Sequence, residues 1–184
     1  MTVVYIVIGV IIILVVYVIT KYNAIVKLRN IRSQSFADID VQLKLRFDLV
    51  PNLVETVKGY ASHEKQTLEN VTKARTSFMN ASGIDDKMQA DNMLTWALKS
   101  LFAVSENYPD LKANQNFLQL QTELSDIENK IAAARRFFNN ATQEYNTYIQ
   151  IFPSNIIANA FNFHEETLFG VSAPEERDAV KVSF

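Results

Sequence analysis

The chain opens with a long uninterrupted run of apolar residues. Residues 2–20 carry no charged side chain, and 14 of these 19 residues are Val, Ile or Leu. As a helix they span about 28 Å, close to the ~30 Å hydrocarbon thickness of a bilayer. The run is too long for a β-strand, and it lacks the basic leader and small-residue cleavage site of a signal peptide. The pattern therefore predicts an uncleaved transmembrane anchor that contacts the lipid bilayer through residues 2–20.

Basic residues lie on one side of this run only. No Lys or Arg precedes it, whereas Lys21, Lys27, Arg29 and Arg32 follow within twelve residues. Because loops rich in Lys and Arg stay in the cytoplasm, we expect a single-pass cell-membrane protein. Its N-terminus is predicted to lie outside, and residues 21–184 in the cytoplasm.

Beyond the anchor, apolar residues recur every three or four positions, as on one face of a helix, and Pro and Gly separate the segments that show this pattern. No Gly or Pro falls between Val10 and Val50, so the first helix should continue from the membrane over about 21–48. Asp48 and Pro51 predict a break there. Further helices are predicted over about 51–80 and 86–107.

The strongest pattern lies between Pro109 and Pro153. Every seventh residue from Phe117 to Phe152 is apolar, and each of the first five is followed three residues later by another apolar residue. This heptad pattern predicts one helix over about 109–152 in coiled-coil-like packing. A short helix is expected over 154–162, followed by a tail over 164–184. The predicted fold is all-α: a transmembrane helix, residues 1–20, that continues into an elongated antiparallel bundle of long helices over 21–163.

Composition excludes several classes of chemistry. The chain has no cysteine, two histidines and a net charge of −2, so it has no disulfide or thiolate metal site and no general nucleic-acid footprint. His63 and Glu64 begin like a zinc-protease helix, but Thr67 stands where the second histidine ligand is required. We therefore predict no catalytic, cofactor-binding or metal-ligating residues, no cofactor, no nucleic-acid partner and no enzyme activity.

Glu64 is the charged residue that stands out. Val57 and Val71 flank it at seven-residue spacing on the apolar stripe of the predicted helix 51–80. A buried carboxylate is costly unless it is paired. We expect an ion pair with a basic residue such as Arg46 or Arg135. A stripe edge open to water and a catalytic role are the alternatives.

Charge is distributed unevenly along the chain beyond the anchor. Residues 21–79 hold ten basic and six acidic residues, a net +4, whereas residues 80–184 hold eight and fourteen, a net −6. Opposite charge would attract the early helices to the later ones. The basic half could instead bind anionic lipid, which attracts juxtamembrane cations.

The end of the chain alternates apolar and polar residues. Val180, Val182 and Phe184 alternate with Lys181 and Ser183, as in an extended segment with one apolar face. We expect this tail to dock, either on its own bundle or on a partner.

Several stretches resemble the LemA family, over nearly the whole chain after the anchor. The matching residues are Asp38–Lys44, Asp48–Ala61 with His63 and Glu64, Tyr108–Asn114 with Phe117, Glu128–Ile131 with Arg135, Tyr145 and Asn146 before Phe152 and Pro153, and Val182–Phe184. Phe36 stands where Trp is common in the family, Phe47 where a second Arg is common, and Asn162 where Gly is common. Of these three departures, only Asn162 bears on the geometry of a turn.

The resemblance implies a bacterial or archaeal protein with one N-terminal membrane helix and a cytoplasmic helical bundle. It brings no catalytic residues with it. We therefore expect a membrane-anchored scaffold or interaction protein, with a protein partner or self-association. The alternative is a membrane-organising or lipid-surface-binding protein.

Overall fold

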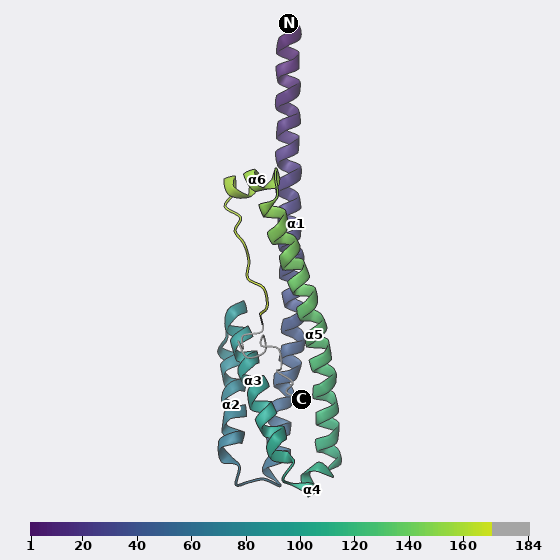
Figure 1. Ribbon diagram of the computed structural model, residues 1–184, viewed down its shortest axis with the longest axis vertical. Helices are drawn as coiled ribbons and strands as arrows, with labels where there is room; N and C mark the ends of the chain where they lie inside the picture. The colour runs from purple at the N-terminus through teal and green to yellow at the C-terminus, as the bar shows by residue number, and fades with distance from the viewer. Residues whose placement is uncertain (171–184) are drawn as a thin grey trace, which may run out of the picture. The chain divides into compact units, whose positions relative to one another are not determined.

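The computed structural model describes residues 1–170, and the regular secondary structure in that range is entirely helical (Figure 1). The helices are α1 (Thr2–Lys58), α2 (Lys65–Asn80), α3 (Ile84–Ser105), α4 (Pro109–Lys112), α5 (Gln115–Gln150) and α6 (Ser154–Ala160). The predicted all-α fold, with a long apolar N-terminal helix and bundled helices, is confirmed. Val180, Val182 and Phe184 lie outside the described residues, so the docking of the tail end stays a prediction.

The first helix continues through Pro51, so the predicted break between 48 and 51 is wrong. Proline removes one hydrogen bond and clashes with the preceding turn. Here Val50, Leu53 and Val57, on both sides of Pro51, are all buried. Their packing outweighs the local cost of the proline and keeps the segment helical. The predicted helices 21–48 and 51–80 are therefore replaced by α1 and α2.

The chain actually turns between Lys58 and Lys65. Gly59 directly follows α1, and backbone hydrogen bonds from Tyr60 and Ala61 to the Val57 carbonyl, 3.0 and 2.8 Å long, close the turn. Gly59 thus lies just past a helix end, which is where glycine is most common. The helix predicted over 51–80 placed this glycine in its interior.

The later helices follow the predicted order with one difference. Helix α3 begins and ends within two residues of the predicted 86–107. The predicted helix 109–152 is interrupted, because Asn114 accepts a hydrogen bond from the Phe117 amide at 3.0 Å. Asparagine is a preferred residue at a helix N-cap, so α5 begins at Gln115 and α4 remains a separate turn.

Contacts among the described residues form two compact units. One unit contains Met1–Ala37 with Ala134–Phe169, and the other contains Asp38–Ala133. Helices α1 and α5 each contribute a segment to both units. The predicted division into an anchor over 1–20, a bundle over 21–163 and a tail over 164–184 stays a prediction.

The unit formed by residues 38–133 has a core drawn from helices α1 to α5. Phe117, Leu124 and Ile131, three heptad positions of α5, are buried in it, as predicted from their spacing. Phe47 stacks on Phe78 with ring centroids 3.9 Å apart. The remaining buried apolar residues of this core are Ile39, Leu43, Val50, Leu53, Val57, Ala61, Leu68, Val71, Ala74, Ala90, Leu94, Ala97, Leu98, Leu101 and Leu111.

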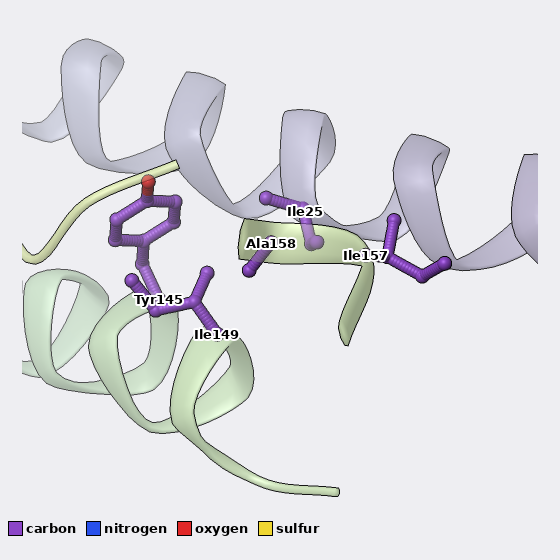
Figure 2. Packing of buried hydrophobic residues seen from close by; sticks show 5 residues of the cluster. All are labelled: Ile25, Tyr145, Ile149, Ile157 and Ala158. Atoms are coloured by element: carbon purple, nitrogen blue, oxygen red, sulfur yellow. The ribbon is translucent and has the colours of Figure 1, made fainter. Parts of the chain in front are cut away.

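The other unit packs α1, α5 and α6 around a small apolar cluster (Figure 2). Its buried members come from α1 (Ile25), α5 (Tyr145 and Ile149) and α6 (Ile157 and Ala158). Val18, Tyr22, Leu28, Tyr148 and Phe163 pack against it. Short helix α6 is therefore held against α1 and α5 by a cluster in which Tyr145 is the buried heptad residue of α5.

Candidate functional site

The N-terminal third of α1 presents apolar side chains that nothing in the described structure covers. Within residues 1–170, α1 is the helix whose length and composition suffice to cross a membrane, and its most apolar stretch is wholly unburied. The large apolar residues from Val3 to Val16, together with Ile19, are roughly half exposed or more. This distinguishes the segment from a core helix of a soluble domain, whose apolar residues are buried.

A buried cation is the centre of the polar network in the unit of residues 38–133. The Arg46 side chain on α1 is 1% exposed. One terminal nitrogen lies 2.6 Å from Asp91 Oδ1, and the other lies 2.5 Å from Glu128 Oε1 and 3.1 Å from Thr95 Oγ1. The guanidinium thereby joins α1 to α3 and α5.

The electrostatics of this network indicate a structural role. Burial lowers the pKa of Arg46 below its ordinary value, while Glu128 opposes that effect. Arg46 Nε is buried without a hydrogen-bond partner among residues 1–170. Arg46 and Glu128 also line a groove of about 370 Å³ together with Phe102. The two carboxylates that pair with the guanidinium come from two other helices, so this one side chain links three helices.

Glu64 does not pair with Arg46 or Arg135, so that prediction is wrong. The turn over 59–64 takes Glu64 off the apolar stripe and places it, half-buried, directly before α2. Its carboxylate accepts a hydrogen bond of 3.2 Å from the Tyr108 hydroxyl. Desolvation, together with this hydrogen bond, raises the pKa of Tyr108.

One of the two acidic partners of Arg46, Asp91, carried a signal in the sequence. Asp91 precedes Leu94 by three residues and Leu98 by seven, which places it on the buried face of α3. An acidic residue at such a spacing is the candidate that our sequence analysis missed. Arg135 instead lies over the Phe169 ring, 4.6 Å from its centroid.

An extended segment after α6 is held on α5 by two asparagines seven residues apart. Asn139 accepts a hydrogen bond from the Phe169 amide at 2.7 Å and donates one to the Phe169 carbonyl at 3.0 Å. Asn146 makes the equivalent pair with Glu166, at 2.9 and 2.8 Å. Both asparagines bind backbone groups, so the segment over 164–169 is fixed independently of most of its side chains.

Arg32 and Tyr145 complete this attachment. Arg32 lies 3.3 Å from a Glu166 carboxylate oxygen and donates hydrogen bonds to Thr142 Oγ1 and the Thr167 carbonyl. The Tyr145 hydroxyl donates to the His164 carbonyl at 3.1 Å. Desolvation raises the pKa of Tyr145, and the nearby Glu166 carboxylate raises it further.

Metal-binding geometry is not found among residues 1–170. His63 and His164 are both exposed, and no three His, Asp or Glu side chains of that range gather into a potential metal site.

A surface groove of about 360 Å³ lies between α2 and α3. Trp96 and Met93 line it together with Lys73, and the Trp96 side chain is 53% exposed. The Lys99 ammonium lies 4.8 Å from the centre of the Trp96 ring. Exposed Trp and Met residues beside a groove are typical of protein-binding surfaces.

Comparison with known proteins finds one family and a small set of relatives. The model of the LemA family matches residues 35–184. Protein LemA of Metamycoplasma hominis is 28% identical over 163 residues, which cover 86% of this chain and 73% of the relative. Magnetosome protein MamQ of Magnetospirillum gryphiswaldense is 24% identical over 175 residues, which cover 81% of this chain and 64% of MamQ. Magnetosome protein MamQ 1 of Paramagnetospirillum magneticum matches to the same extent.

Proposed function

The chain belongs to the LemA family, and from this premise we propose a membrane-anchored, non-enzymatic scaffold or interaction protein. In this proposal α1 crosses the cell membrane with its N-terminus outside. The remaining helices lie in the cytoplasm and present a binding surface to a protein partner.

The observation that carries the proposal is the change in burial along α1. From Val3 to Val16 its large apolar residues are exposed, whereas Ile25, Ile39 and Leu43 are fully buried. Such exposed apolar surface is unfavourable in water and favourable in a bilayer. One helix thus supplies both a lipid-facing stretch and a part of the protein core.

The groove beside Trp96 supports the interaction role. Trp96 and Met93 present apolar surface outside the core, with Lys73 and Lys99 beside them. The polar groups of the Arg46 network are engaged with one another across three helices. The chemistry of the described residues therefore favours binding over catalysis.

Fusion reporters test the topology. A reporter that is active only outside the membrane, fused to the C-terminus, should be silent, and activity there would refute the orientation. Moving the four cations Lys21, Lys27, Arg29 and Arg32 to the N-terminal flank should weaken or invert the topology.

Photo-crosslinking tests the partner surface. A photo-reactive residue at Trp96 of the full chain should give a stoichiometric adduct in membranes. The same probe at exposed Phe137 on α5 is the matched control. Equal labelling at both positions would remove the support for a specific surface beside Trp96.

A second candidate is a membrane-organising role through lipid-surface binding. Lys27 and Arg29 follow the anchor and are both exposed. In vesicles containing the full chain, they should immobilise spin-labelled anionic lipid in a salt-sensitive way. If Lys27→Ser with Arg29→Ser leaves that immobilisation unchanged, the lipid-surface role is wrong.

A further inference from the structure

Four large apolar side chains are exposed around α6 and the corner that joins it to α5. Ile151 and Phe152 lie in the corner, Ile156 lies on α6, and Phe161 directly follows it. Phe152 is 79% exposed although it occupies the last position of the heptad pattern. Several exposed apolar residues close together in a fold mark a surface that binds a membrane or another protein.

Helix α6 has two different faces. Ile157 and Ala158 are buried against Ile25 of α1 and the two α5 residues of the cluster (Figure 2). Ile156 is not a member of this cluster and is 56% exposed. The fold therefore fixes one side of α6 on the helical unit and leaves Ile156 largely exposed.

Contacts with α1 place these exposed residues at the end of the predicted membrane span. The Phe161 ring packs edge-on against Tyr22, with centroids 4.9 Å apart. The Lys21 ammonium lies 5.5 Å from the centre of the Tyr148 ring on α5 and 5.7 Å from that of Tyr17. Lys21 and Tyr22 directly follow residues 2–20, so α6 packs where α1 would leave the bilayer.

The residues around this end of the predicted membrane span are of types found at the membrane–water interface. Tyr and Trp side chains are enriched at the membrane–water interface, and lysine reaches from there towards water. A short helix with one apolar side can rest in the boundary between headgroups and acyl chains. Tyr17, Lys21 and Tyr22 on α1 and Phe152 and Phe161 beside α6 together fit that boundary.

We propose that Ile151, Phe152, Ile156 and Phe161 insert into the interfacial layer of the membrane leaflet at which α1 emerges. The bilayer would then contact the chain twice, through α1 and through this surface, which we term the α6 surface. Two contacts on one compact unit would fix how that unit is turned relative to the membrane plane. This inference rests on the proposed membrane anchor.

Quenching by lipids with brominated acyl chains tests the proposal in the full chain. Trp96 is the chain's one tryptophan, so Trp96→Phe gives a background in which a single new tryptophan reports its depth. In vesicles of brominated phospholipid, Phe152→Trp should lose most of its fluorescence and shift its emission to shorter wavelength. Phe137→Trp is the matched control, because Phe137 is a 58% exposed phenylalanine of α5 in the same unit, fourteen residues before Ile151.

Tyr5→Trp in the same background tests the membrane anchor separately from the α6 surface. If the Tyr5→Trp variant escapes quenching, the anchor itself fails, and with it the α6 surface. If that variant is quenched but Phe152→Trp is quenched no more than Phe137→Trp, the inference is overturned while the anchor stands.

A second copy of the chain is the other possible occupant of the α6 surface. A dimer in vesicles that Phe152→Ser with Phe161→Ser converts to a monomer, without quenching of the Phe152→Trp variant, would also overturn the inference.

Discussion

Asn146 binds the backbone of Glu166 with both ends of its side-chain amide. Its oxygen accepts from the Glu166 amide at 2.9 Å, and its nitrogen donates to the Glu166 carbonyl at 2.8 Å. Two turns earlier on α5, Asn139 holds Phe169 in the same way. An extended segment, which would otherwise leave its backbone groups unpaired, thereby obtains hydrogen bonds from a helix surface.

Asn146→Ala should release this segment. The substitution removes two hydrogen bonds and leaves backbone groups of Glu166 without partners, which costs about 1–3 kcal/mol. The Glu166 amide should then exchange its hydrogen much faster than in the wild type. Hydrogen exchange and denaturant unfolding of the full chain in detergent micelles measure the two effects.

Asn140→Ala is the control for that substitution, because Asn140 is exposed on the same helix. It should change the free energy of unfolding by no more than about 0.5 kcal/mol. Equal exchange at Glu166 in both variants would show that Asn146 does not hold the segment.

Arg46→Ala should be among the most destabilising single substitutions. It leaves the fully buried Asp91 carboxylate without its cation, which costs about 3–5 kcal/mol. Replacing both residues, as Arg46→Met with Asp91→Leu, should recover a large part of the loss, because the buried Asp91 charge is removed as well and the Glu128 side chain, which is 44% exposed, can be solvated by water. Lys44→Ala, at an exposed position of the same helix, should have little effect.

Unfolding of the wild type, the two single variants and the double variant as a double-mutant cycle gives the coupling energy. If the double variant loses the sum of the two single losses, the ion pair is not the cause of the destabilisation.

The sequence patterns that predicted structure correctly are those that depend only on neighbouring residues of the same helix. The apolar run of residues 2–20 and the heptad positions Phe117, Leu124 and Ile131 depend only on spacing and side-chain type. The uninterrupted length of the first pattern and the seven-residue spacing of the second each identify apolar helix surface without knowledge of the rest of the fold. The long apolar N-terminal helix and the buried face of α5 therefore followed from the sequence.

Structural features that depend on residues far apart in the chain could not be predicted from the sequence. Pro51 predicted a break on local grounds, but burial of its neighbours keeps α1 continuous. Asn139 and Asn146 resemble ordinary exposed polar residues until an extended segment 20 to 30 residues later binds to them. Asp91, one of the two acidic partners of Arg46, lies 45 residues away from it, and only the position of Asp91 on an apolar stripe hinted at the pair.

Ile131 tests the heptad pattern directly. Its side chain is 1% exposed, so Ile131→Asp places an unpaired carboxylate in the core and should cost several kcal/mol. Asp126→Ala, at an exposed position of the same helix, should cost no more than about 0.5 kcal/mol. Similar shifts of the thermal unfolding midpoint in the two variants would contradict the assigned face of α5.

Asn162 closes helix α6 in a left-handed conformation, with φ of 60°. The Phe163 amide donates to the Ala158 carbonyl at 2.9 Å, and the Asn162 amide donates to the Asn159 carbonyl at 3.4 Å. These two bonds form a Schellman motif, in which Gly is the commonest residue at the left-handed position and Asn the usual substitute. The family's preference for Gly here thus has a backbone cause, and Asn meets the same requirement.

Asn162→Gly should therefore be tolerated or stabilise the chain by a few tenths of a kcal/mol, whereas Asn162→Ala should cost about 1 kcal/mol or more. The matched control is Asn159→Gly, three residues earlier and also exposed, but inside α6. There glycine lowers helix stability, so the same substitution should act in the opposite direction. Denaturant unfolding of the full chain in micelles compares the three variants. If glycine destabilises equally at 159 and 162, the left-handed turn does not contribute to stability as argued.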